Sequence, residues 1–372
     1  MAKAPLRIHC PVASRHPTPP MDSLTQAALG AAVAHACWHR TLGRPALLWG
    51  VALGTLPDLD ILVFPWLDPV GRLVWHRGVS HSLWAMVLGA LALAPLIRWV
   101  HRRAPPPPTF REAFTGAWLI YSSHVLIDVF TVYGTQLLAP FSRHGFGLNN
   151  LFIIDPLYTL PLVLGILLAA VLRTPRARYL VNVCGLALST AYVAWSFVAQ
   201  ARAATIFAAE LARKGHAVAP GRAITSATPL NTVLWRHLAE VEGGFLIGYW
   251  SWLDADTRVR FDYVPRAAER LPPAVRESRA FATVAWFSQD YWAVLDGPGE
   301  DGLPVADLRF SEMRTGTGTP PDEWTWPFAW SFPAAAPAGT EIPLIQIPAD
   351  FSSRGAGFDD VWRRIQGDRT AW

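Results

Sequence analysis

Six ionisable side chains in this sequence have the residue types and spacings of metal ligands. They occur as three pairs, in GTLPDLDILV, HRGVSHS and SSHVLIDVF: Asp58 with Asp60, His76 with His81, and His124 with Asp128. Imidazole nitrogens and carboxylate oxygens together suit Zn²⁺, with Mn²⁺ or Fe²⁺ as alternatives, and such a set could hold one or two ions. An ionisable group at membrane depth costs about 3 kcal/mol or more, so these residues in apolar surroundings indicate a function.

The spacing within two of the pairs favours convergence on one point. His124 and Asp128 are four residues apart and therefore share one face of a helix. Asp58 and Asp60 would diverge on a regular helix, but Pro57 interrupts the helix and lets a short turn direct both carboxylates inward.

The third pair brings a loop and a helix start together. His81 follows Ser80, which we predict to be the N-cap of the next helix, and His76 lies in the connection before it. Each pair alone also has a structural interpretation: a proline turn, a basic cluster beside the membrane, or a hydrogen-bonded pair that links helices. The metal site is predicted from the conjunction of the three pairs.

If the site is catalytic, the chemistry it favours is metal-assisted hydrolysis. Asp60 is then expected to be a bridging ligand or the general base. Arg77, which follows His76, is expected to stabilise negative charge on the substrate, which favours a phosphoester. A lipid or lipid-linked substrate is expected if the site lies at the membrane boundary.

The composition indicates a membrane protein. Of 372 residues, 52% are hydrophobic and only 16% are charged, which is too apolar for an ordinary soluble protein of this size. The net charge of +4 comes from arginine clusters beside apolar runs, so direct nucleic-acid binding is not expected. Cys10, Cys37 and Cys184 lack CxxC spacing and are expected to be small buried residues rather than disulfide partners or metal ligands.

The apolar runs predict a mainly α membrane protein. Helices are expected over 23–39, 46–64, 80–100, 112–131, 151–172 and 179–201, and most of them match a hydrocarbon core of roughly 30 Å. Residues 21–202 would thus form a polytopic bundle of five to six membrane helices. Residues 1–20 are expected to be a disordered tail or an overextended start, with Met21 as the better beginning. Residues 203–372 are expected to form a small soluble α+β or β-rich domain.

Arginines predict the orientation of the bundle. Three loops between the expected helices contain clusters of arginine (Arg40 and Arg44; Arg98, Arg102, Arg103 and Arg111; Arg173, Arg176 and Arg178) and are expected to be cytoplasmic. The three ligand pairs then lie towards the outer face of a bacterial inner membrane, together with Asp155 and the C-terminal domain. The tryptophans of that domain are expected to fill a β core or to rest on the membrane interface.

The sequence resembles a known family at these residues. The segments MDSLTQAALGAAV, GTLPDLD, HRGVSHSL, SHVLIDVFTVYGTQLLAPFS and LFIIDPLYTLPL are similar to the membrane-bound metal-dependent hydrolases of the YdjM and YbcI type, also described as LexA-binding, inner-membrane-associated hydrolases. The resemblance covers residues 21–200, and it implies a polytopic inner-membrane protein with a metal centre. Many relatives have histidine where this sequence has Gln26, which puts a second metal position in doubt.

The function expected from the residues and the resemblance is metal-dependent hydrolysis of an ester or phosphoester. The alternative is a non-catalytic membrane protein in which the polar cluster is structural and the C-terminal domain binds a partner whose identity the sequence does not give. A transporter ranks last, because the inner halves of the helices are almost uniformly apolar apart from His35 and His39.

Overall fold

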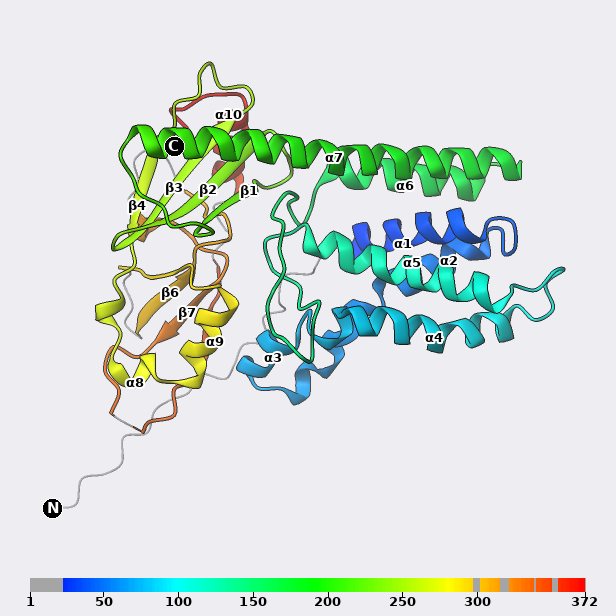
Figure 1. Ribbon diagram of the computed structural model, residues 1–372, viewed down its shortest axis with the longest axis horizontal. Coiled ribbons are helices and arrows are strands. Elements are labelled where there is room, and N and C mark those ends of the chain that lie inside the picture. Colours follow the sequence, from blue (N-terminus) through cyan, green and yellow to red (C-terminus); the bar gives the residue numbers. More distant parts are fainter. Residues whose placement is uncertain (1–22, 297–301, 315–320, 338, 350–353, 372) are drawn as a thin grey trace.

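The computed structural model describes residues 23–296, 302–314, 321–337, 339–349 and 354–371. The predicted tail over residues 1–20 lies outside them. Six helices lie side by side in one bundle (Figure 1): α1 (Ser23–Trp38), α2 (Pro45–Thr55), α4 (Leu83–Val100), α5 (Phe110–Val129), α6 (Pro156–Val171) and α7 (Pro175–Arg213). Short helices connect α2 to α4: the 3₁₀ helix η1 (Pro57–Trp66), α3 (Pro69–Trp75) and the 3₁₀ helix η2 (Val79–His81).

The bundle has two or three helices that could cross a membrane. By length and apolar composition α4 and α7 qualify, and α2 with η1 counts as a third if this pair, bent by 45°, is one span. The predicted count of five to six spans is not confirmed. Among the described helices, α1, α2 and α6 have 16, 11 and 16 residues, and α5 carries the polar residues of one ligand pair.

Local sequence explains where the helices begin and break. The expected helix over 46–64 breaks at Leu56 because Pro57 starts a new helical segment. Asp155 caps α6 by accepting hydrogen bonds from two backbone N–H groups of its first turn. The cap of α4 is Ser82 rather than the predicted Ser80, whose hydroxyl instead contacts ligand-pair residues.

Glycines bring α1 and α2 into close contact. Gly50 and Gly54 have the GxxxG spacing that lets helix backbones approach, and they face Gly30 of α1. A Cβ atom on Gly50 would overlap the backbone of Gly30 and Ala31. This contact fixes the C-terminal end of α2, from which η1 and its carboxylates follow.

The helix α7 belongs to both parts of the molecule. It has 39 residues, which corresponds to a length of about 58 Å, and it passes beyond the bundle into the sheet domain (Figure 1). Its second half is buried there through Ala199, Ala203, Ile206 and Phe207, which pack against Trp235 and Trp250. The expected helix over 179–201 therefore continues to Arg213.

The rest of the chain forms two antiparallel sheets of four strands. One has the order β1 (Ala223–Ala227), β2 (Leu234–Val241), β3 (Gly244–Ser251), β4 (Phe261–Pro265); the other has the order β5 (Trp292–Val294), β6 (Leu303–Asp307), β7 (Ala329–Phe332), β8 (Ile345–Ile347). The remaining helices are η3 (Ala268–Arg270), α8 (Pro273–Arg276), α9 (Arg279–Phe287), η4 (Pro321–Glu323) and α10 (Arg354–Ile365). Many of the tryptophans fill this domain, including Trp235, Trp250 and Trp330.

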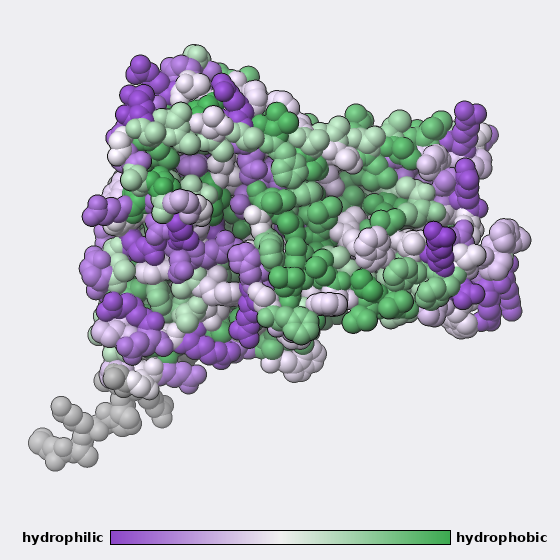
Figure 2. Space-filling model, in the orientation of Figure 1, coloured by the Kyte–Doolittle hydropathy of each residue, from purple (hydrophilic) through white to green (hydrophobic). Residues whose placement is uncertain are grey.

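The surface of the bundle is apolar between two polar ends. Figure 2 shows a hydrophobic band over the helices, bordered on one side by the sheet domain and on the other by a polar end. The three arginine-containing loops lie at that far end of the bundle. Within this bundle Cys37 and Cys184 are free and exposed, not buried as expected.

Candidate metal centre

Four of the six expected ligands converge where the bundle meets the sheet domain. Asp58, His81, His124 and Asp128 each offer one ligand atom, and these atoms all lie within 4.8 Å of one another. They come from the start of η1, from η2 and from the last two turns of α5. The centre therefore depends on the break at Pro57 and on the four-residue spacing within α5.

Five of the six distances among the four ligand atoms match a small tetrahedral ion. His81 Nε2 lies 3.2 Å from Asp128 Oδ2 and 3.4 Å from Asp58 Oδ1, and His124 Nε2 lies 3.6 and 3.5 Å from the same two oxygens. The two Nε2 atoms are 3.2 Å apart. Metal–ligand bonds of about 2.0–2.2 Å place tetrahedral ligands about 3.3–3.6 Å from one another, so the set could hold Zn²⁺ without a large rearrangement.

The second nitrogen of His124 fixes its tautomer. Nδ1 lies 2.6 Å from the backbone carbonyl oxygen of Gly54, which can only accept a hydrogen bond. Nδ1 therefore carries a proton, and in the neutral ring the lone pair is on Nε2, directed at the other ligands. The glycine contact between α1 and α2 holds this carbonyl in place.

A chain of hydrogen bonds also fixes the tautomer of His81. The Ser80 hydroxyl donates to Asp60 Oδ2 over 3.2 Å and lies 2.9 Å from His81 Nδ1. Because its only proton goes to the carboxylate, Ser80 accepts from Nδ1, which leaves the Nε2 lone pair facing inward. Two imidazole lone pairs and two carboxylate oxygens thus face one another.

Such an arrangement requires a positive charge among the four atoms. Asp58 Oδ1 and Asp128 Oδ2 are both buried, and each lies 3.2–3.6 Å from the Nε2 atoms of His81 and His124. His81 lies outside the three candidate spans; burial by itself lowers its pKa, but hydrogen bonds and charge from Asp128 and Asp58 outweigh burial and raise the pKa to about 9. A proton on His81 or a divalent cation can supply the charge.

The other two expected ligands, Asp60 and His76, lie beside the centre as a pair. His76 Nδ1 is 3.1 Å from Asp60 Oδ1, and the other oxygen of Asp60 accepts from the Arg77 backbone N–H at 3.0 Å. Asp60 is 3.8 Å from His81 Nδ1, on the side of that ring away from the four ligand atoms. In this position it orients His81 and His76 from outside the cluster.

Arg77 holds the outer oxygen of one ligand. Its guanidinium lies 3.0 Å from Asp128 Oδ1 and donates to the Thr131 hydroxyl over 2.9 Å. Gln26 donates to the same Asp128 oxygen over 2.8 Å, at the position where the resemblance led us to note a missing histidine. Asp128 therefore presents one oxygen to the cluster and the other to an arginine and an amide.

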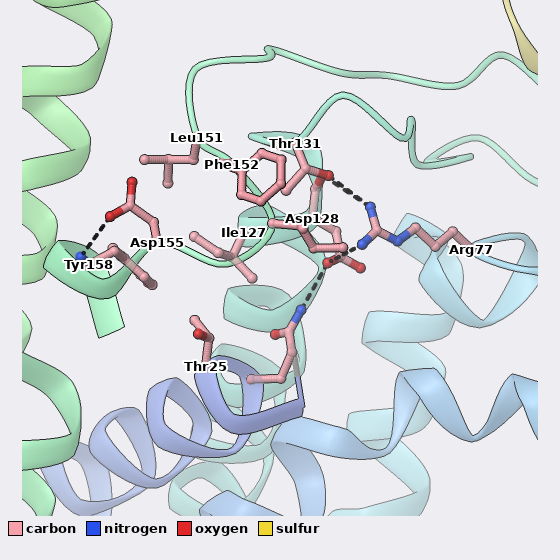
Figure 3. A pocket seen from close by; sticks show the side chains of 11 residues that line it. Thr25, Arg77, Ile127, Asp128, Thr131, Leu151, Phe152, Asp155 and Tyr158 are labelled. Carbon is pink, nitrogen blue, oxygen red and sulfur yellow. Dashed lines mark hydrogen bonds and ion pairs between the residues drawn. The ribbon is translucent and has the colours of Figure 1, made fainter. Parts of the chain in front are cut away.

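A small pocket lies on the outer side of Asp128 (Figure 3). Its lining comes from α1, the end of α5, the loop before α6 and the start of α6, and it includes Gln26, Arg77 and Asp128. The other three ligand residues do not line it. The pocket thus reaches the centre only through the carboxylate oxygen that Arg77 and Gln26 occupy.

The sheet domain packs on the same region through Tyr133. The Tyr133 ring lies 5.4 Å from the His76 ring and 4.9 Å from the Arg77 guanidinium carbon. On its other side are three rings of the sheet domain, with centroids 5.0, 6.3 and 6.2 Å away: Phe287, Phe310 and Phe328. Tyr133 and these three residues are called the aromatic cap below.

Sequence reasoning missed several residues that support the centre. Tyr133, Thr131 and Gln136 lie in the segment that continues SHVLIDV, where polar residues remain frequent after α5 ends. Gln136 donates its side-chain amide N–H to the Val74 carbonyl and its backbone N–H to the Arg77 carbonyl, so this loop holds the connection that carries His76 and Arg77. The frequency of polar residues directly after α5 was the sequence signal that could have identified them.

Comparisons with known proteins find partial matches to this chain. A protein of Bacillus subtilis (strain 168) named YfhP is 28% identical over 120 residues, which cover 30% of this chain and 34% of that protein. The inner membrane protein YbcI of Escherichia coli (strain K12) is 34% identical over 96 residues, which cover 24% of this chain and 50% of YbcI. The chain thus aligns with half or less of the length of these relatives, and no solved structure matches it.

The profile of the YdjM inner membrane protein matches residues 21–203, a range that contains all four converging ligands, the Asp60–His76 pair and Arg77. Residues 21–203 of this chain therefore belong to the YdjM inner membrane protein family.

Proposed function

We propose that the chain is a multi-pass inner-membrane hydrolase that uses a divalent cation, most simply Zn²⁺, to cleave an ester or phosphoester. The observation that supports the proposal is the set of four potential ligand atoms facing one another, with both Nδ1 atoms in contact with outer partners. By the positive-inside rule the arginine-containing loops are cytoplasmic, which puts the centre and the sheet domain on the outer side.

A divalent cation bound there would lower the pKa of water and polarise a phosphoryl or carbonyl oxygen. In hydrolysis of a phosphoester, the water oxygen bonds to phosphorus, the bond from phosphorus to the leaving alcohol breaks, and one proton of the water passes to that alcohol. We assign His76, held by Asp60 and with its ring centroid 6.4 Å from that of His81, to take and return this proton in the manner of other histidine–carboxylate pairs. Arg77 neutralises Asp128, so the site does not repel an anionic substrate.

The test is hydrolysis of phosphodiesters and lipid esters by purified protein that has been stripped of metal and then reloaded. We expect activity only after reloading. His76→Gln should lower the rate by about 10²–10⁴-fold with metal content unchanged, whereas His144→Gln, a change at an exposed loop residue, should have no effect. Activity that survives metal removal, or none on any substrate, would contradict the proposal.

One observation favours a second candidate, a structural metal that clamps the bundle. Structural zinc sites have four protein ligands and no open position, and here four protein side chains surround the centre. On this alternative, His81→Ala lowers the thermal stability of the membrane part, and His76→Gln changes nothing measurable.

A further inference from the structure

We infer that the centre receives its substrate sideways from the bilayer, and that this substrate is a phospholipid whose acyl chains stay in the membrane during the reaction. The inference deepens the proposed function and rests on it. It follows from where the centre is closed, where it meets the surface, and what surrounds that opening.

The centre is closed on the side of the sheet domain. The aromatic cap covers His76 and Arg77, and Arg77 is only 1% exposed. Behind the cap, the carbonyl of Tyr133 accepts from Arg309, which forms a buried ion pair with Asp307. A solute arriving from the water around the sheet domain would have to separate this packing.

The centre meets the surface at one ligand. The side chain of Asp58 is 14% exposed, whereas those of His81, His124 and Asp128 are 2% exposed or less. The pocket of Figure 3 does not provide another entrance, because it reaches only the outer side of Asp128. We call the surface around Asp58 the mouth.

The mouth is surrounded by exposed apolar side chains. Leu59, Ile61 and Leu62 follow Asp58 on η1, and Val79 and Leu83 flank His81 on the neighbouring segment; each is between 44% and 63% exposed. The ionisable residues within 49–66 and 73–97 are all members of the site already described. The surface next to Asp58 is therefore formed by aliphatic side chains, of the kind that make up the apolar band of the bundle in Figure 2.

Aromatic residues place the mouth at the level of lipid head groups. Trp66 ends η1 and is 80% exposed, and Trp84 at the start of α4 stacks edge-on against the exposed Phe141, with ring centroids 5.9 Å apart. Exposed tryptophans of this kind mark the membrane–water interface. The phosphoester linkages of phospholipids lie at this depth, so a lipid can reach the mouth without leaving the bilayer.

The experiment uses the full-length protein in nanodiscs of dioleoylphosphatidylglycerol diluted with dioleoylphosphatidylcholine. We expect the rate of phosphatidylglycerol hydrolysis to follow the mole fraction of that lipid in the disc, not its bulk concentration. Leu59→Trp and Val79→Trp, which narrow the mouth, should lower the rate by roughly tenfold or more with metal content unchanged. Leu164→Trp, on the exposed face of α6, is the matched control and should leave the rate unchanged.

A second measurement is independent of turnover. In protein loaded with Mn²⁺, electron–nuclear double resonance should detect a phosphorus coupling from the disc lipid, and Val79→Trp should weaken it while Leu164→Trp does not. A phosphorus coupling without hydrolysis would refute the proposed hydrolase activity but support lateral entry of the lipid to the centre. A rate set by bulk concentration, a coupling that only inorganic phosphate produces, or a second copy of the chain crosslinked over Leu59 and Val79 would overturn the inference.

Discussion

The substitution Asp58→Asn tests the metal centre most directly. Asp58 supplies one of the four facing atoms, and its carboxylate contacts the Nε2 atoms of His81 and His124 at 3.4 and 3.5 Å. Asparagine keeps the size of the side chain and removes the charge that attracts a cation. The other carboxylate, Asp128, is less informative, because its removal would also leave the buried Arg77 without its ion pair.

The expected magnitude follows from linkage between binding and folding. A metal present at 100 times its Kd stabilises the folded protein by about 2.7 kcal/mol. Changes around a metal site typically weaken binding by 10–100-fold, and we take about 100-fold for loss of a charged ligand. At the same metal concentration the variant would then gain only about 0.4 kcal/mol, a difference of about 2.3 kcal/mol from the wild type.

The assay is thermal unfolding of detergent-purified protein, first stripped of metal with a chelator and then titrated with Zn²⁺, together with elemental analysis. The wild type should gain stability on titration, Asp58→Asn should gain little, and Glu269→Gln, which removes an exposed charge in the sheet domain, should behave as the wild type. Equal stabilisation of Asp58→Asn and wild type, or none in either, would refute the assignment of the four ligands.

Three further predictions concern the folded state. Burial, together with the charge of Arg236, lowers the pKa of His237 to about 4, so the unfolded chain binds more protons between about pH 6.5 and 4; stability should fall by up to about 3 kcal/mol as the pH drops through this window, and melts of His237→Gln should lack this loss. Burial raises the pKa of Glu312, but Arg236 and Arg314 outweigh it and hold the pKa at about 2. Glu312→Gln should cost about 3–5 kcal/mol in denaturant unfolding, because it leaves the buried Arg236 without its ion pair while Arg314 keeps Asp262; a loss below about 1 kcal/mol would contradict this. Gly50→Ala should separate α1 from α2, shift the Gly54 carbonyl that fixes His124 and weaken Zn²⁺ binding in calorimetry, whereas unchanged affinity would show that this contact does not position the centre.

Periodicity and helix-stop signals were enough to predict most of the bundle. Pro57 and Asp155 mark boundaries in the sequence, and the structure has a helix start at each. A helical stretch after residue 202 was expected as part of the soluble domain, but its continuity with α7 was not, because the apolar face from Ala199 to Leu211 packs on a sheet whose strands come later in the chain. Such contacts cannot be read from a local pattern.

The candidate site, too, could be predicted from the sequence only in part. The identity of the three pairs follows from residue type and spacing, but which donors share a point depends on rotamers and on partners distant in the chain. Asp60 is two residues from Asp58, yet its oxygens bind the Arg77 backbone, Ser80 and His76 rather than joining the four ligand atoms. Only the placement of η1 against η2 decides between these arrangements.

The continuous helix α7 has a mechanical consequence for the whole molecule. From Leu186 to Arg213 it contains neither glycine nor proline, so it acts as a stiff shaft between the bundle and the sheet domain. Each residue inserted into a continuous helix rotates the domain that follows by about 100° and moves it by about 1.5 Å along the helix axis. A single alanine inserted after Gln200 would therefore rotate Phe287, Phe310 and Phe328 away from Tyr133, so the length of this segment sets the angular alignment of the two halves.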